Sequence, residues 1–571
     1  MAVFFNGRLW ISPATMSVVD DSAMANQNLS VGNVVALMGR SSGGKPNTPL
    51  RFGSPSEAQA VLRSGELLTA VLKAFDPSAQ TNGPSTVVAI RVNPATQASL
   101  TLLDSSNNPV IDLVSTDYGL YTNQIKVKIE NGTNAGKRVT TQLGNDYYSQ
   151  DNLARNAFSI RYNGAAATAV MTITNTQVNL QAPSGTDVAV IDLNTFRTIQ
   201  ELVDRINTTT GFTATVLDGN GQKPALNGLD SVTVQDVKTA DYVATANLQA
   251  IVDWFNSTTE GFVTATRAAN AGAVPANIPF TYLSGGSDGI VTNSEWSDAY
   301  TTLQTVDVQW VVPVSSDPAI HAMNDSHCAF MSNVARMERR GIVGTGIGTS
   351  DEDALAAAKA LNSDRTSLVH IGYYDYDENG KLSLFPPYLL AAMIAGAFSG
   401  VNPGTPLTNK TIKVRGLERD LRNPTDTDVL IEGGVLCVEN TPSGYKVVKS
   451  ITTWLVNDNY NRVEVSVGFA CDFVARNVRN ALDILRGEKA SPISLSRAVS
   501  ITESTLRELA RPEPSGPGVI VGDAENPPYR NIRATIEGDV LRVEFQCSPV
   551  LPINYIPITI YAVPYSGTAT A

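Results

Sequence analysis

The sequence has few of the side chains on which most enzymes and metal sites depend. Its 571 residues include only four cysteines and three histidines. His321, His327 and His370 form no HExxH-like ligand pattern, so no metal site and no other cofactor is predicted. The cysteines form no CxxC pair, which favours buried thiols in a reducing compartment, although one chance disulfide stays open.

Two glycine-rich stretches invite a chemical interpretation, and neither supports it. No GxxxxGK followed by Ser or Thr occurs, and GIVGTGIGTS (341–350) does not fit GxGxxG. Three carboxylates, from Asp351 to Asp353, follow it at the positive end of the next helix and would repel an anion, so Ser350 is predicted as an N-cap. TYLSGGSDG (281–289) is not in the strand-to-helix setting of a hydrolase nucleophile. No catalytic residue is predicted, and a hydrolase stays open only because histidines are present.

The chain has an excess of negative charge, and its first residues contain no basic leader. The formal net charge is −12, which makes nucleic acid an improbable partner. The first residues lack a basic leader, and Asn6-Gly7 interrupts their apolar run. The longest other apolar stretch, 384–401, contains two prolines and two glycines, which favours a buried helix over a membrane span. We therefore expect no membrane partner and a chain that is used without crossing one.

The sequence does contain a clear change in the pattern of predicted strands and helices. Residues 33–93 and those after 290 alternate apolar strands with amphipathic helices, which is typical of a largely parallel sheet. Residues 100–280 are rich in Thr, Asn, Val and Gly, and several runs end in the hairpin signals Asn-Gly or Asp-Gly. The pattern predicts one α/β domain split by a β-rich insertion, with the loop 281–289 as the junction.

Residues 411–548 read as an α+β segment. Strands are predicted at 411–420, 429–440 and 445–454, and an amphipathic helix at 472–486. On that helix Asp472–Arg476 and Arg479–Asp483 have i,i+4 spacing and are predicted to pair on a solvated face.

Both ends of the chain are apolar and almost uncharged. The last 24 residues carry no charge, and the first nineteen carry only Arg8. An uncharged, β-prone end left free would template aggregation, so it must pair with its own sheet or with another chain. Both possibilities stay open on composition. The residues predicted for exchange between subunits are Phe4, Phe5, Leu9, Trp10, Tyr555, Ile556, Ile558 and Ile560.

In its ordered set of features the chain resembles contractile tail sheath proteins of phages and related injection machines. The resemblance rests on the split α/β domain, YLSGGSDG, then VRGLERD, GGVLCVEN and ITTW, the helix with Arg476 and Arg479, and the final GDVLRVEFQCSPVLPINYIPITIYAV. It implies a subtilisin-like α/β core followed by an α+β C-terminal domain with exchanged terminal strands. The expected segments are an N-terminal arm (1–24), the core in two parts (25–98 and 283–410), the insertion (99–282), the C-terminal domain (411–548) and a C-terminal arm (549–571).

The resemblance also implies a mechanical function without a cofactor. Sheath subunits form stacked hexameric rings around a tail tube and contract to drive the tube through the host envelope. Implied partners are further copies, the tube protein, and baseplate and tail terminator or neck proteins, in a virion tail assembled in the host cytoplasm. Candidate tube contacts are Arg476, Arg479, Arg486 and Arg507. Alternatives are the sheath of a bacteriocin or secretion-type injection system, a secreted β-rich surface protein, and a hydrolase.

Overall fold

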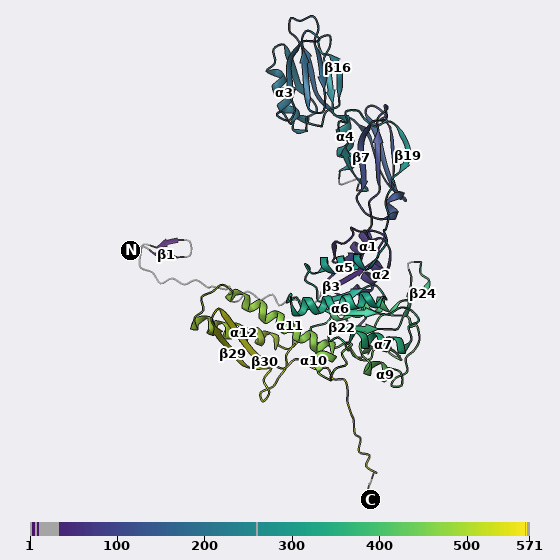
Figure 1. The fold of residues 1–571 in the computed structure, drawn as a ribbon, viewed down its shortest axis with the longest axis vertical. Helices are drawn as coiled ribbons and strands as arrows, with labels where there is room; N and C mark the ends of the chain where they lie inside the picture. Colours follow the sequence, from purple (N-terminus) through teal and green to yellow (C-terminus); the bar gives the residue numbers. More distant parts are fainter. Residues whose placement is uncertain are drawn as a thin grey trace.

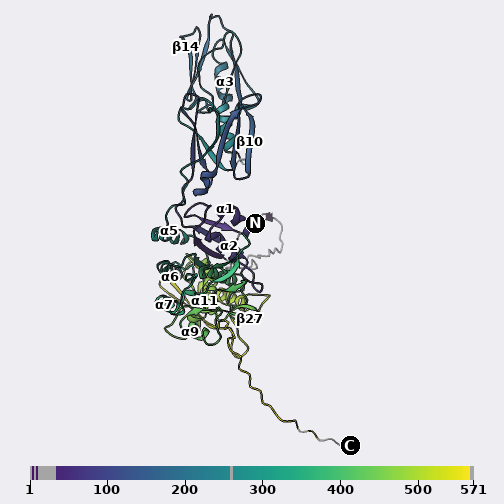
Figure 2. The ribbon, with the colours of Figure 1, turned by 90° about the vertical axis from the view of Figure 1, so that its right-hand side faces the viewer.

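The computed structural model describes residues 3–5, 8–10, 34–257, 261–377, 379–565 and 567. A body at one end contains the parallel sheet and most of the helices, and an elongated β-rich part rises from it (Figures 1 and 2). The C-terminal arm leaves the body on the side away from the β-rich part.

A seven-stranded sheet with the order β26-β22-β21-β20-β3-β5-β4 forms the centre of the body. All neighbouring pairs are parallel except β4–β5. The sheet draws strands from both sides of the β-rich segment, because β3 and β20 are direct neighbours. Its strands are β3 (Val34–Gly39), β4 (Pro49–Phe52), β5 (Thr86–Arg91), β20 (Trp310–Pro313), β21 (Arg340–Gly344), β22 (Thr366–Val369) and β26 (Val435–Leu436).

Helices cover both faces of this sheet. One core includes residues of α1 (Pro55–Leu62), α2 (Glu66–Phe75), α7 (Asp351–Leu361), α8 (Pro387–Ser399) and α9 (Thr427–Glu432). The other contains residues of α5 (Asn293–Leu303) and α6 (Pro318–Asn333). Nearly all of α8 is buried, which confirms the buried helix predicted for this apolar stretch. Among the described residues, no helix is both long enough and apolar enough to cross a membrane.

The β-rich segment contains two separate hydrophobic cores, one near the body and one at the far end (Figure 1). Each lies between a three-stranded and a four-stranded antiparallel sheet. The near unit consists of β6 (Ser99–Leu103), β7 (Pro109–Ser115), β18 (Val263–Arg267), β8 (Lys126–Asn131), β9 (Lys137–Leu143), β10 (Asp146–Leu153), β19 (Ile278–Tyr282) and α4 (Asn247–Phe255). The far unit consists of β11 (Asn156–Tyr162), β15 (Phe212–Val216), β17 (Tyr242–Thr245), β12 (Val170–Ile173), β13 (Gln177–Gln181), β14 (Asp187–Asp192), β16 (Val232–Asp236) and α3 (Ile199–Asn207).

The C-terminal part packs two long helices against a two-stranded hairpin. Helices α11 (Val465–Leu482) and α12 (Pro492–Leu509) share a small core with β29 (Tyr529–Glu537) and β30 (Val540–Cys547). Short elements connect it to the sheet: β23 (Tyr373–Tyr376), β24 (Leu382–Phe385), β25 (Gly416–Leu417), β27 (Val438–Thr441), β28 (Gly444–Val447), α10 (Tyr460–Val463) and the 3-10 turn η3 (Asp483–Leu485).

The predicted class, α/β and α+β with several domains, is confirmed by these sheets and cores. Two details differ. Residues 429–440, predicted as one strand, begin inside α9 and then form β26 and β27. The helix predicted at 472–486 begins earlier, at Val465, because its first turns pack on the central sheet. Strand β26 also carries the sheet past the predicted boundary at residue 410, and the domain boundaries stay predictions.

Candidate assembly surfaces

Beyond Val550, the described part of the C-terminal arm forms no strand with its own chain. From Leu551 to Tyr565 the backbone has no ladder partner, and the arm extends away from the body (Figures 1 and 2). Its large apolar side chains are 50–97% exposed. The predicted exchange residues Tyr555, Ile556, Ile558 and Ile560 are among them, which leaves an uncharged and unpaired strand-forming segment on each copy.

The N-terminal residues form a hairpin of their own. Strand β1 (Val3–Phe5) pairs only with β2 (Arg8–Trp10) in the described part of the chain, with Phe4 opposite Leu9. The side chains of Phe4, Phe5, Leu9 and Trp10 lie outside the described residues, so their predicted role in strand exchange stays a prediction.

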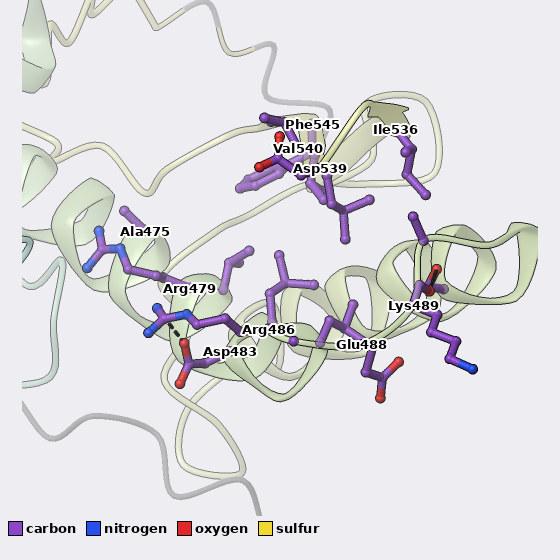
Figure 3. A pocket seen from close by; sticks show the side chains of 18 residues that line it. Ala475, Arg479, Asp483, Arg486, Glu488, Lys489, Ile536, Asp539, Val540 and Phe545 are labelled. Carbon is purple, nitrogen blue, oxygen red and sulfur yellow. Dashed lines mark hydrogen bonds and ion pairs between the residues drawn. The ribbon is translucent and has the colours of Figure 1, made fainter.

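A groove runs beside the hairpin β29–β30 (Figure 3). It has a volume of about 610 Å³ and lies between strand β30 and the end of α11. Its floor is apolar, with Val478, Leu482, Leu485, Val543 and Phe545, and its rim carries charges. The hairpin has no third strand in the described chain, so its outer edges keep backbone donors and acceptors free.

Helix α11 is fixed to the central domain by ion pairs that the sequence did not predict. Asp472 accepts from Arg340 Nε at 3.0 Å and from Arg365 Nη1 at 2.7 Å. Arg476 Nη1 donates to Asp307 at 2.6 Å, and Arg479 pairs with Glu338. We call these residues the α11 clamp.

Two predictions about α11 are therefore wrong. Asp472 and Arg476 do not pair with each other on a solvated face, because each pairs with a residue of the central domain. Asp472 accepts from Arg340, and Arg476 donates to Asp307. The side chain of Arg476 is only 8% exposed and is held by Asp307, which leaves little of it for the predicted tube contact, and that contact stays a prediction. Arg479 is one-third exposed and is held by Glu338 rather than by Asp483.

Arg486 and Arg507, the other two candidate tube contacts, are on the surface. Arg486 is 82% exposed and pairs with Asp483 at 2.6 Å (Figure 3). Arg507 is 70% exposed and pairs with Glu503 at 2.8 Å. Ion pairs this exposed are weak, so both guanidinium groups are available to a partner.

A buried arginine–histidine contact lies behind the α11 clamp. Arg339 Nη1 donates to His327 Nε2 at 3.0 Å and to the carbonyl of Leu303, and Nε and Nη2 donate to two further backbone carbonyls. Burial, and then the charge of Arg339, lower the pKa of His327 to about 3 from 6.5. The imidazole is therefore neutral in the folded chain, and the lone pair of Nε2 accepts the hydrogen bond from the guanidinium.

Acid should destabilise this region through His327. The folded state resists protonation of the imidazole, so the unfolded state takes up more protons as pH falls from 6.5 towards about 3. At about pH 5 this costs roughly 2 kcal/mol. In urea unfolding at about pH 7.5 and pH 5, His327→Gln, which keeps an acceptor, should reduce the pH-dependent loss by that amount. An unchanged loss would mean that His327 is protonated in the folded state.

The loop 281–289 is a junction between the body and the β-rich segment. Arg91, buried at the end of β5, donates to Asp288 Oδ1 and to the carbonyl of Tyr118, each at 2.9 Å. Ser287 pairs with Thr96 in an isolated bridge, and Ser287 N donates to Thr96 Oγ1 at 3.0 Å. Residues 285–289 and 39–43 both spell GxSxG, but Ser287 lies in this extended linker and not at a sharp strand-to-helix turn.

The loop 341–350 is closed by the chain's own carboxylates. Glu418 accepts from the backbone N–H of Gly348 at 2.7 Å and of Gly372 at 3.0 Å, so these anion-binding donors are occupied. Ser350 caps α7, as predicted. His370 Nε2 lies 2.9 Å from Asp351, which also pairs with Arg419. Both glycine-rich loops thus have structural partners.

Comparison with known proteins agrees with this reading of the chain. No family model matches. The tail sheath protein of Bacillus phage SP01 is 29% identical over 588 residues, covering 100% of this chain and 98% of that protein. A putative tail sheath protein of Enterococcus phage phiEF24C is 28% identical, with 96% of each chain covered. The tail sheath protein of Staphylococcus phage Twort is 24% identical, with 95% of each covered.

Solved structures extend the likeness to the fold. A sheath tail protein from Desulfitobacterium hafniense has a TM-score of 0.56 at 12% identity, and covers 94% of this chain and 96% of its own. One from Listeria innocua has a TM-score of 0.56 at 15% identity, with 93% and 94% covered. The resemblance to tail sheath proteins is thereby confirmed: over 95% or more of its residues this chain is similar to tail sheath proteins of phages.

Proposed function

We propose that the chain is the structural subunit of a contractile phage tail sheath. It polymerises as stacked hexameric rings around the tail tube, and the sheath contracts to drive the tube through the host envelope. The observation that carries the proposal is the C-terminal arm, an exposed, uncharged and unpaired strand-forming segment, on a chain whose relatives are tail sheath proteins.

The acceptor for the arm is the hairpin β29–β30 of a neighbouring subunit. Ten residues, 556–565, reach about 33 Å when extended, enough to pair with the eight residues of β30. Alternate arm side chains then enter the apolar groove beside β30, which supplies a floor for Ile556, Ile558 and Ile560 (Figure 3). The N-terminal arm (1–24) adds a further strand to a neighbour in the same way.

The remaining domains are arranged around these exchanged arms. Residues 25–98 and 283–410 form a subtilisin-like core domain, and residues 411–548 form the C-terminal domain that faces the tube. The insertion, residues 99–282, projects to the outside of the sheath, consistent with its rise away from the body (Figure 1). Its place there accommodates variable bulk.

The work is mechanical and needs no cofactor. More surface between subunits is buried on contraction, and this stored assembly energy moves the tube. Partners are other copies, the tube protein, and baseplate and terminator or neck proteins of a virion tail that is assembled in the host cytoplasm. Neither nucleic acid nor a membrane is a partner. The sheath of a bacteriocin or secretion-type injection system is the second candidate.

Negative-stain microscopy of the purified chain tests the proposal. Rings or tubes of sheath dimensions are the expected result. Particles that stay monomeric at every concentration and ionic strength, with and without tail tubes, would contradict it and favour the enzyme or surface-protein alternatives.

Charge reversal on the exposed arginines tests the tube contact. A contact that must release after firing should be polar, and Arg486 and Arg507 are its exposed candidates. Arg486→Glu with Arg507→Glu should weaken cosedimentation with tubes roughly five- to thirty-fold at low ionic strength. Salt should reduce the difference, because it screens exposed charges.

The matched control is Arg511→Glu, an arginine of similar exposure that pairs with Glu508 just beyond α12. It should bind tubes as the unmodified chain does. If the double variant also binds normally across ionic strengths, the tube contact lies elsewhere on the C-terminal domain.

A further inference from the structure

The C-terminal arm is held at its root before it becomes free. Val550 N donates to Val519 O at 3.0 Å, and Pro549 forms a bridge with Ile520. Asn554 Nδ2 then donates to Glu464 Oε1 at 2.8 Å. Lys449 Nζ lies over the ring of Tyr555, 6.0 Å from its centroid. From Ile556 onward the described arm has no contact of this kind with the body.

Glu464 is an unusual anchor, because it stands at the N-cap position of α11 and does not cap it. Aspartate at this position ordinarily accepts from the first free N–H groups of its helix. Here the side chain makes no such bond and is directed to the arm and to Lys449, whose Nζ lies 3.6 Å from Oε1. Glu464 is 1% exposed.

The contact between Glu464 and Asn554 combines a favourable hydrogen bond with two unsatisfied polar atoms. A hydrogen bond to a charged carboxylate is among the stronger kinds in proteins. Two atoms of the same pair, Glu464 Oε2 and Asn554 Oδ1, are nevertheless buried without a hydrogen-bond partner among the described residues. Burial raises the pKa of Glu464, and Lys449 and Asn554 oppose that rise. An incompletely satisfied buried pair gives up part of its stability to desolvation.

We propose that Glu464 and Asn554 form a releasable root clamp that fixes where and in which direction the C-terminal arm leaves the subunit. Closed, the root clamp leaves residues 556–565 free, a reach of about 33 Å. Open, it frees residues 551–565, and the reach rises to about 50 Å. The gain of about 17 Å is slack that lets an arm stay paired while its neighbour moves. The value of this slack rests on the proposed sheath function; the clamp itself does not.

Limited proteolysis measures the root clamp in the unassembled full-length chain. Chymotrypsin binds several residues on each side of the bond it cuts, so the segment around Tyr555 must detach from the body before cleavage after Tyr555. Tyr561 lies in the free part of the arm and serves as an internal control. In Asn554→Ala the ratio of cleavage at Tyr555 to cleavage at Tyr561 should rise about tenfold. Asn554→Asp should raise it as much, because a carboxylate supplies no donor to Glu464. Glu464→Gln keeps an acceptor of the same shape and should stay within about threefold of the unmodified chain.

Assembly supplies the second readout. Without the clamp the arm is not positioned in advance, so Asn554→Ala should raise the protein concentration needed for polymerisation several-fold, and Glu464→Gln should not. Unchanged cleavage ratios in both Asn554 variants would overturn the root clamp. A raised ratio with unchanged polymerisation would overturn its positioning role. If even the unmodified chain forms no polymer, the proposed function fails, while the cleavage ratios still decide whether the clamp exists.

Discussion

Deleting residues 556–571 should abolish polymerisation and leave a folded subunit. The described side chains in this stretch are exposed and contact nothing in their own chain that holds the fold together. Their loss should therefore change stability by no more than about 0.5 kcal/mol, as for ordinary surface changes. Asn554 remains in the truncated chain, so the root of the arm is undisturbed.

The effect on assembly should be large because the arm contributes several buried side chains per contact. Burying three isoleucines contributes about 5–9 kcal/mol before ordering costs are subtracted. Even half of that changes the affinity of one contact by more than about tenfold, and in the proposed sheath each subunit donates and accepts an arm. Microscopy and sedimentation should therefore find monomers at concentrations where the full chain forms tubes.

A length-preserving variant separates pairing from chain length. Ile556, Ile558 and Ile560, replaced together by asparagine, keep the backbone able to pair but cannot fill the apolar groove. This variant should also fail to polymerise. Thr559→Ala, on the opposite face of the strand, should assemble. Normal tubes from the truncated chain would show that the arm pairs with no neighbour, and an unfolded truncation would show that the arm belongs to its own subunit's fold.

The architecture of this chain could be predicted from sequence because its signals are local. Alternating apolar strands and amphipathic helices identified the parallel sheet on both sides of the insertion, and Asn-Gly and Asp-Gly endings identified the hairpins. The prediction of a single strand at residues 429–440 was wrong because it relied on local residue types alone. Their β-branched residues suggest a strand, but Val429 and Leu430 belong to α9, whose buried side chains pack on the central domain.

The ion pairs of α11 could not be predicted, because their partners are distant in sequence. Arg476 meets Asp307, 169 residues earlier, and Asp472 meets Arg340, 132 residues earlier. Helical spacing shows which residues share a face and not whether that face meets solvent or another domain. For the C-terminal arm, the lack of charge predicted that the arm must pair, but not with which chain. The structure leaves the described arm unpaired in its own chain.

Removing the carboxylate at Asp472 should be among the most destabilising single changes in the chain. Arg340 and Arg365 are 4% and 16% exposed, and Asp472 is the carboxylate that both contact. Breaking a buried pair leaves uncompensated charge, at a cost of about 3–5 kcal/mol. Asp472→Asn should therefore lower the urea-unfolding midpoint strongly, although it keeps the shape of the side chain.

The control lies on the same part of the chain. Asp483→Asn removes a carboxylate that pairs only with the exposed Arg486, and it should cost less than about 1 kcal/mol. Gly468→Ala adds a second test, because an added Cβ would collide with the guanidinium of Arg340 and push it from Asp472, and would also press on the carbonyl of Asn461. It should resemble Asp472→Asn more than Asp483→Asn, even after the small helix preference for alanine over glycine is allowed for.

This result bears on how force passes through a subunit. An arm paired to β29–β30 pulls on the small core that α11 and α12 share with that hairpin. The α11 clamp ties that core to the central sheet through Arg340 at the start of β21 and Arg365 just before β22, beside the packing of Val465 and Phe469 in the central core. If Asp472→Asn costs several kcal/mol, hairpin and sheet move as one body and contraction turns whole subunits. If it costs no more than Asp483→Asn, the ion pairs do not hold the two parts together, and within the proposed sheath only the packing of α11 in the central core resists motion inside the subunit.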